Sequence, residues 1–148
     1  MKALSVKNPY AYHISTGEKT IELRSRPTSH RGELLICSSK KARMNTYISY
    51  QKEFWRVPDG VAMAVVNIID CRPATIDDVE NAWASEDDIE GMFAWVLENV
   101  KDTKPTPIFG KLNFFEVPDE NIEFLGDELD IDYYQKEKPT DKDYIHHY

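Results

Sequence analysis

The sequence has few cysteines and lacks the short signatures of several common functions. Only two of its 148 residues are cysteines: Cys37 ends an apolar run, and Cys71 lies just beyond another. This placement excludes a disulfide framework and a cysteine metal pair, so we expect two buried free thiols. The four histidines have no zinc-ligand spacing, and no phosphate-binding loop, dinucleotide fingerprint or nucleophile elbow is present. We therefore expect no metal and no cofactor.

Long apolar runs are also missing. No run approaches the length that crosses a membrane, and the first residues lack the basic, apolar and small pattern of a leader. We therefore expect a cytoplasmic protein with no membrane partner. A length of 148 residues suits a single domain with its own core.

Basic residues are outnumbered overall, but they are concentrated at one end. The net charge is −8, yet residues 1–56 hold 11 Lys or Arg against 4 Asp or Glu. The remaining residues hold 7 basic and 22 acidic side chains. This asymmetry indicates either a polar or anionic partner for the first part, or two halves that neutralise each other across the fold.

Eight residues in the basic part, 17–24, form the most informative motif of the chain. Thr20, Glu22 and Arg24 alternate with Ile21 and Leu23, as on a strand with one apolar and one charged face. Lys19 stands at the start of this strand. We expect the charged set to face a surface or a cleft.

Turn signals and apolar periodicity predict an α+β protein. Asn8 and Pro9 are typical of a helix start, and Gly17 is typical of a helix end. The spacing of apolar residues between 44 and 55, and again between 75 and 83, indicates two further helices. Strands are predicted at 2–6, 20–24, 33–37, 61–69, 92–97 and 111–117. Five or six short strands with flanking helices indicate a small mixed β-barrel.

The segment 119–148 is acidic with scattered aromatic residues. We expect a domain over residues 1–118 and a C-terminal extension over 119–148, part docked and part loosely ordered. The side chains expected to dock are apolar or aromatic: Phe124, Leu125, Leu129, Ile131 and Tyr133. His146 and His147 are expected in the loosely ordered tail.

The pattern Gly17-x-Lys19-x-x-Glu22-x-Arg24 resembles the G-x-K-x-x-E-x-R signature of ASCH domains, which belong to the PUA-like superfamily. The flanking pieces agree with this resemblance. Residues 4–11 look like the family's opening strand and its proline, 31–36 like its next strand, and 111–115 like its closing strand. The resemblance covers roughly residues 1–117, and it implies a PUA-like β-barrel with a cleft that carries the motif.

The resemblance also implies an RNA- or nucleotide-binding protein. One branch, similar to bacterial acetylcytidine amidohydrolases, is enzymatic, and it has a lysine at the position of Lys19. That branch has a threonine where this chain has Glu22. Because of this difference, enzymatic activity is the alternative function and not the leading one. The alternative is a hydrolase acting on a modified pyrimidine nucleoside, or a ribonuclease, with Lys19 and Glu22 as catalytic residues.

The candidate ligand-binding residues come from three parts of the chain. Lys19 and Arg24 suit a phosphate or a base edge, and Glu22 can accept from a base, orient Lys19 or neutralise its neighbours. An ordinary surface ion pair is the plain alternative. Ser38, Ser39 and Lys40 lie in a basic loop after a buried strand, which either binds the ligand or is a solvated turn. The last two candidates are Tyr10 and Trp95, aromatic residues that either stack on a base or belong to the core. A third reading is an adaptor that binds protein through its acidic residues 77–148.

Overall fold

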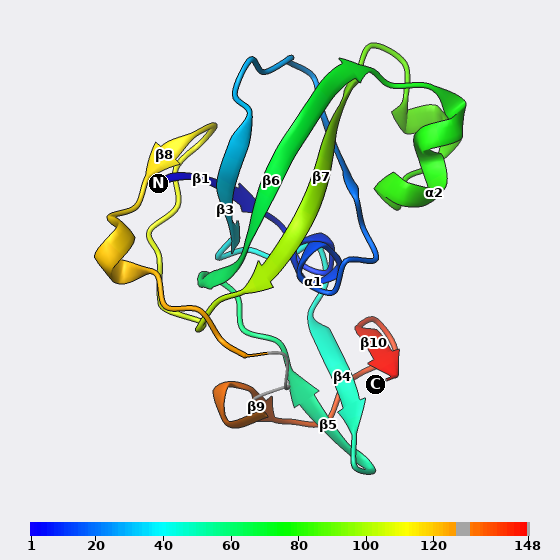
Figure 1. Cartoon of the computed structure of the whole chain (residues 1–148). Coiled ribbons are helices and arrows are strands. Elements are labelled where there is room, and N and C mark those ends of the chain that lie inside the picture. The colour runs from blue at the N-terminus through cyan, green and yellow to red at the C-terminus, as the bar shows by residue number, and fades with distance from the viewer. Residues whose placement is uncertain (127–130, 148) are drawn as a thin grey trace.

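The main sheet of the protein is a curled half-barrel of six strands. The computed structural model describes residues 1–126 and 131–147. The strands follow the order β2-β7-β6-β3-β1-β8 (Figure 1). Their bounds are β1 (Lys2–Val6), β2 (Ile21–Arg24), β3 (Gly32–Ser38), β6 (Ala62–Pro73), β7 (Phe93–Asp102) and β8 (Phe115–Glu116). The α+β class with a curled barrel sheet is confirmed.

Strand β3 lies in the interior of this sheet and is buried on both faces. It pairs in parallel with β1 and antiparallel with β6. Leu34 and Ile36 belong to the main core, while Leu35 and Cys37 pack into a second cluster on the opposite face. This double burial explains the nearly continuous apolar run that predicted the strand.

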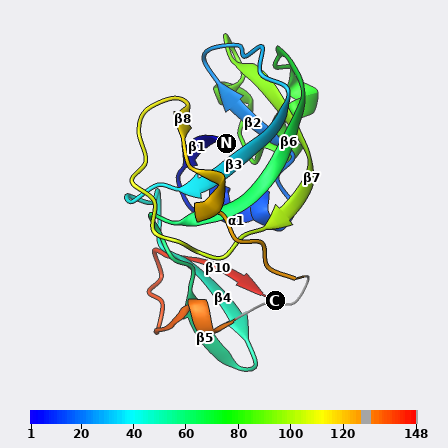
Figure 2. The same ribbon diagram turned by 60° about the vertical axis from the view of Figure 1, so that its left-hand side comes forward.

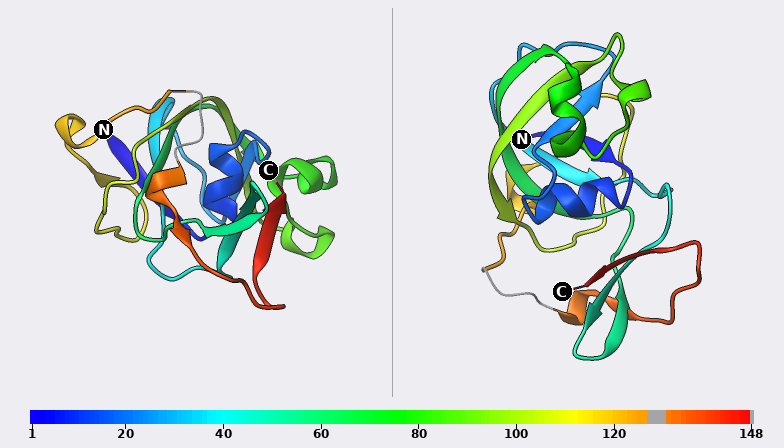
Figure 3. Two further views of the ribbon diagram at one scale, coloured as in Figure 1. Left: turned by 90° about the horizontal axis from the view of Figure 1, so that it is seen from below. Right: turned by 90° about the vertical axis from the view of Figure 1, so that its right-hand side faces the viewer.

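Helix α1 (Tyr10–Ser15) lies between the curled sheet and a smaller sheet (Figure 3). It begins one residue after Pro9, and the Asn8 side-chain oxygen accepts a hydrogen bond from the Tyr12 backbone N–H at 3.0 Å. Gly17 follows with φ +82°, a left-handed conformation that favours glycine. The helix start and its glycine end are therefore as the sequence predicts, to within one residue.

The smaller sheet corrects the helix that we expect between 44 and 55. Strands β4 (Thr46–Tyr50) and β5 (Glu53–Arg56) form a hairpin there. Gln51 and Lys52 turn the chain with φ of 50° and 65°. Ile48 lies opposite Trp55 across the hairpin, so apolar residues that suggest a helical face meet by strand register instead.

Two other predicted elements differ in length. The strand expected at 111–117 is reduced to the two residues of β8, because it pairs only with the start of β1. The helix expected at 75–83 is divided into η1 (Ile76–Asp78) and α2 (Val79–Ala82), and η2 (Glu86–Asp88) follows. Trp83 takes a left-handed conformation with φ 55°, which ends α2 after one turn.

Two strands of the C-terminal segment complete the smaller sheet, whose order is β10-β4-β5-β9 (Figure 1). Short turns η3 (Asp119–Asn121) and η4 (Ile131–Tyr133) precede β9 (Gln135–Lys136) and β10 (Tyr144–His147). The expectation of a loose tail at His146 and His147 is wrong, because β10 pairs in parallel with β4. Ile131 packs against the main core, Phe124 remains 49% exposed, and Leu129 lies outside the described residues.

The structure has ten strands in its described part, which exceeds the expected five or six because the smaller sheet was not predicted. Placing a domain boundary at residue 118 stays a prediction. Across residues 1–126 and 131–147, none of the helices has the length and apolar character to span a bilayer.

Candidate ligand-binding site at the Lys19–Glu22–Arg24 motif

The motif lies at a seam of the curled sheet. Strand β2 is one edge of the sheet and pairs with β7, with Glu22 opposite Trp95. The sheet curls until β2 approaches β1, which lies near the other edge. Arg24 bridges this seam, because its Nη2 donates to the Ser5 carbonyl of β1 at 3.2 Å. The charged face of the motif thus lies on the open side of the half-barrel, where Arg24 links β2 to β1.

Lys19 is buried, with 3% of its surface exposed. Its Nζ donates to the carbonyl oxygens of Ile21 (2.6 Å) and Ala82 (2.7 Å) and lies 3.4 Å from Glu22 Oε1. Three oxygen atoms therefore surround the ammonium group. Since Ala82 ends α2, this lysine also ties the start of β2 to a helix far along the chain.

Opposing effects act on the proton of Lys19. Burial lowers the pKa of this amine, and the nearby Arg24 lowers it further. Glu22 acts against them by attraction and hydrogen bonding. The net direction is a lowered pKa with burial as the main cause, in an amine that is held by acceptors on all sides.

Glu22 is the centre of the motif. Arg24 donates to its Oε2 through both Nε (3.1 Å) and Nη2 (2.9 Å), while its Oε1 faces Lys19. The carboxylate is 10% exposed and the Arg24 side chain 30%. Of the three charged groups, the guanidinium is therefore the one that solvent or a ligand reaches most easily.

Arg24 and Trp95 line a pocket that encloses about 520 Å³. It is bordered by the end of β2, the residues that follow it, β7, β1 and the loop before β8. Its lining residues are Leu4, Arg24, Ser25, Arg26, Pro27, Thr28, Trp95, Leu112, Asn113 and Phe114. This volume accommodates a small polar ligand with a planar ring.

Aromatic rings form one wall of this pocket. Trp95 is 6% exposed, donates from Nε1 to the Arg26 carbonyl at 3.0 Å, and lies under the Arg24 guanidinium at 6.0 Å. Its ring centroid is 5.5 Å from that of Phe114, and the two rings are tilted by 32°. From the sequence, Trp95 is expected either in the core or as a stacking platform. In the structure it packs in the main core and also lines the pocket.

Tyr10 approaches the motif from α1. Its ring centroid lies 5.6 Å from Lys19 Nζ and 6.0 Å from the Arg43 guanidinium. The ring is partly exposed and lies between two cations. Sequence reasoning named Tyr10 but not Arg43, whose position in a run of basic residues was the available signal.

Ser38, Ser39 and Lys40 lie at the end of β3. Ser38 is buried, and its hydroxyl donates to the Pro58 carbonyl at 3.1 Å and accepts from the Val61 N–H at 3.2 Å. The contacts given for residues 1–126 and 131–147 include none between these three residues and the motif. Lys40 is exposed and contacts Phe109 instead. Their ligand contacts stay a prediction.

Of the ten residues that line the pocket, sequence reasoning named only Arg24 and Trp95. The eight that it missed include Arg26, Thr28, Asn113 and Phe114. Arg26 and Thr28 directly follow the motif, so their position in the chain was a usable signal. Asn113 and Phe114 reach the pocket only because the chain before β8 returns beside β1, and no local pattern announces that return.

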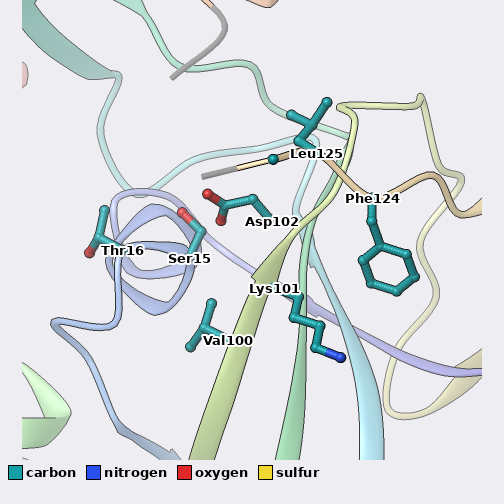
Figure 4. A pocket seen from close by; sticks show the side chains of 8 residues that line it. Ser15, Thr16, Val100, Lys101, Asp102, Phe124 and Leu125 are labelled. Atoms are coloured by element: carbon teal, nitrogen blue, oxygen red, sulfur yellow. The ribbon is translucent and has the colours of Figure 1, made fainter. Parts of the chain in front are cut away.

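A second pocket of about 600 Å³ lies away from the motif (Figure 4). Ser15 and Thr16 border it from the end of α1, and Lys101 and Asp102 from β7. Phe124 and Leu125 cover another side. It contains no residue of the motif, so it is a useful comparison for experiments on the first pocket.

The two cysteines and the acidic residues in the described part of the chain do not form a metal cluster. Cys37 is buried, and burial raises the pKa of its thiol to about 12, so the thiol stays protonated and unreactive. Cys71 is partly buried and accepts a hydrogen bond from the Thr28 N–H at 3.4 Å. Within the ranges that the structure describes, no three His, Cys, Asp or Glu residues are grouped as metal ligands.

The curled sheet, the helix beside it and the enclosed motif define a PUA-like α+β protein. The model of the ASCH domain family matches residues 4–107, and the chain therefore belongs to this family. A search of curated proteins found no match.

Solved structures show the same fold. The crystal structure of ASCH from Zymomonas mobilis has a TM-score of 0.58 and 16% sequence identity, and the match covers 81% of this chain and 89% of that one. A tyrosine-to-phenylalanine mutant of that protein has a TM-score of 0.56 at 16% identity, over 81% and 91% of the two chains. A serine-to-alanine mutant has a TM-score of 0.56 at 15% identity, over 81% and 89%. At such identities the likeness establishes the fold alone.

Proposed function

We propose that this ASCH domain protein binds RNA or a nucleotide in the pocket bordered by Arg24, Trp95 and Phe114. One observation carries the proposal: Glu22 and Ser5 hold the Arg24 guanidinium in place at the wall of a pocket lined by aromatic rings. A fixed planar cation beside such rings suits a phosphate or a base edge, together with the face of a base.

The roles of the pocket residues follow from their exposure. Arg24 supplies the charge, and Glu22 orients it while neutralising Lys19. Since Trp95 is 6% exposed, Phe114, which is partly buried, offers the more accessible ring. Arg26 is exposed at the same pocket and adds a second cation for a phosphate.

The geometry favours binding over hydrolysis. A Lys19 that acts as a base or a nucleophile must be a neutral amine, a form that burial favours by lowering the pKa of this side chain. Its Nζ instead donates to two carbonyls and lies beside a carboxylate, three contacts that all stabilise the ammonium form. A hydrolase that uses Lys19 and Glu22 is therefore the second choice, and incubation with acetylcytidine and with RNA, followed by product analysis, tests it directly.

Binding assays with two charge-matched variants test the proposal. RNA and nucleotide affinities are measured at low and moderate salt for the wild type, Arg24→Gln and Lys101→Gln. We expect Arg24→Gln to weaken binding about tenfold or more and to reduce its salt dependence, since one phosphate contact is lost. Lys101 borders the second pocket, so Lys101→Gln should change little.

Each other outcome has a clear meaning. A loss of affinity in Lys101→Gln alone would move the site to the second pocket. An affinity that Arg24→Gln leaves unchanged, or no binding at low salt, would overturn the proposal. Product formation that disappears in Lys19→Ala would favour the hydrolase instead.

Two further expectations belong with this proposal. RNA binding fits a cytoplasmic location, which localisation of the tagged protein would test. An adaptor that binds protein through residues 77–148 stays a prediction; pull-downs with and without that segment would test it, and a partner that ignores the segment would count against it.

A further inference from the structure

Phe109 is held in an exposed position on the segment between β7 and β8. Its side chain is 86% exposed, yet the backbone on either side of it is fixed. The Ile108 N–H donates to the Gly60 carbonyl at 2.9 Å. Gly110 packs so closely on β1 that a Cβ there would lie 2.2 Å from Ser5 Oγ. A large apolar ring is therefore presented to solvent by a well-anchored backbone.

The segment that carries this ring approaches β1 at Ser5, a residue that also binds Arg24. Gly110, which follows Phe109, contacts the Ser5 hydroxyl, and Arg24 donates to the Ser5 carbonyl at 3.2 Å. The same segment continues into Leu112, Asn113 and Phe114, which line the pocket. In Figure 2 this segment runs beside β1, ahead of β8. Phe109 therefore lies on the same segment as three pocket-lining residues, three positions before Leu112.

Cations and no carboxylates accompany Phe109 along the two segments that meet here. Lys40 places its ammonium group 5.5 Å from the Phe109 ring centroid. Residues 39–45 contain Lys40, Lys41 and Arg43 but no Asp or Glu, and residues 105–115 contain Lys111 and no acid. The surface is basic in a protein whose net charge is −8, so its charge complements a polyanion.

We infer that the ligand of this protein is a single-stranded oligonucleotide, with one base in the pocket and a neighbouring base stacked on Phe109 beside Lys40. This inference rests on the proposed function and names the class of its ligand. An exposed ring next to a lysine is the combination that binds single strands: the ring stacks on any base face, and the cation follows the backbone. It also explains why the structure keeps an aromatic side chain in water.

A purely apolar partner fits less well. Leu112 is 92% exposed nearby, and a membrane or an apolar peptide would use it together with Phe109. Such a partner would not require cations around the ring. Substitutions that separate aromatic stacking from apolar contact therefore distinguish the two ligand classes.

The test compares a mononucleotide with a single-stranded RNA of about eight nucleotides, a length within the range of single-strand binding sites. Affinities are measured for the wild type, Phe109→Ala, Phe109→Leu and Phe109→Trp. We expect Phe109→Ala and Phe109→Leu to weaken RNA binding about tenfold while the mononucleotide affinity stays the same. Phe109→Trp should retain RNA binding. Phe124→Ala, which removes an exposed phenylalanine from the second pocket, is the matched control.

The outcomes separate this inference from the proposed function. The inference would be overturned, without affecting the proposed pocket, if the wild type bound RNA and the mononucleotide equally well. The same holds if Phe109→Ala left the RNA affinity unchanged. RNA binding that depends on Phe109 but not on Arg24 would support the stacking of a base on Phe109 but overturn the placement of its neighbour in the pocket. Equal weakening by Phe109→Ala and Leu112→Ala, with full binding by Phe109→Leu, would overturn it in favour of an apolar partner. Because Phe109 is exposed, none of its substitutions should unfold the protein.

Discussion

Arg24 and Glu22 form a two-donor ion pair on a single oxygen, in which Nε and Nη2 of the guanidinium both donate to Oε2 of the carboxylate. The other oxygen, Oε1, is left to face Lys19. Each carboxylate oxygen thus serves one cation. The motif keeps two positive charges close together at a seam of the barrel, and Glu22 makes that possible.

Glu22→Gln tests this role of the carboxylate. The amide has nearly the same shape, but it leaves a buried ammonium and a guanidinium facing each other without a counter-charge. We expect the free energy of unfolding to fall by about 3 kcal/mol, the usual cost of removing one partner of a buried ion pair. Urea unfolding at neutral pH measures it. Glu33→Gln, at an exposed position of β3, is the control, and equal stabilities of the two variants would contradict the prediction.

Lys19→Met tests whether the lysine acts mainly as an internal tie. Methionine fills a similar volume, but the carbonyls of Ile21 and Ala82 lose their donor. We expect a loss of about 2–3 kcal/mol in the free energy of unfolding, since buried acceptors are left unsatisfied. Nucleotide affinity of the folded fraction should fall less than in Arg24→Gln.

Comparison of Lys19→Met with Arg24→Gln can also contradict the structural role of the lysine. If Lys19→Met leaves stability unchanged and removes binding as strongly as Arg24→Gln, then the lysine contacts the ligand directly. Affinities must be measured well below the unfolding transition of each variant, so that loss of folded protein is not read as loss of binding.

Elements with strong local signals could be predicted from the sequence. The strand that becomes β3 is a continuous apolar run, and α1 has Asn8 before it and Gly17 after it. The motif strand was predicted from its alternation. These features depend on residues that are near one another in the chain.

Features that depend on distant residues could not be predicted. The burial of Lys19 depends on the Ala82 carbonyl, 63 residues away. Phe114 borders the pocket because the segment before β8 returns beside β1. The hairpin of β4 and β5 places Ile48 opposite Trp55, and their spacing in the chain favours a helix when it is read alone.

His13 should make stability depend on pH. Its side chain is fully buried and stacks on Trp83 with ring centroids 3.7 Å apart. Neither ring nitrogen has a hydrogen-bond partner among residues 1–126 and 131–147. Burial lowers its pKa from 6.5 to about 4, against the attraction of Glu18 and with the repulsion of His146 and Lys19. As pH falls, the unfolded chain therefore takes up this proton before the folded protein does.

The stability from this histidine is complete above pH 6.5 and is lost as the pH falls toward 4, by up to about 3 kcal/mol. His13→Phe keeps a ring against Trp83 but cannot titrate. Urea unfolding at pH 7 and pH 4.5 should show a smaller loss for this variant than for the wild type. Acidic groups titrate in both proteins, so equal losses would contradict the assignment to His13.

Gly110 and Ser5 should be energetically coupled, because a Cβ at Gly110 would lie 2.2 Å from Ser5 Oγ. In Gly110→Ala, either the Ser5 hydroxyl rotates away or the segment that carries Phe109 moves. We expect a loss of about 1 kcal/mol in the free energy of unfolding, typical of mild overpacking, and a weaker affinity for single-stranded RNA.

Ser5→Ala removes the oxygen, keeps the carbonyl that Arg24 uses, and should change little alone. The double variant should recover most of both losses, and a double-mutant cycle from urea unfolding and RNA titrations measures the coupling. Strictly additive losses would show that the close contact between the two residues does not position Phe109.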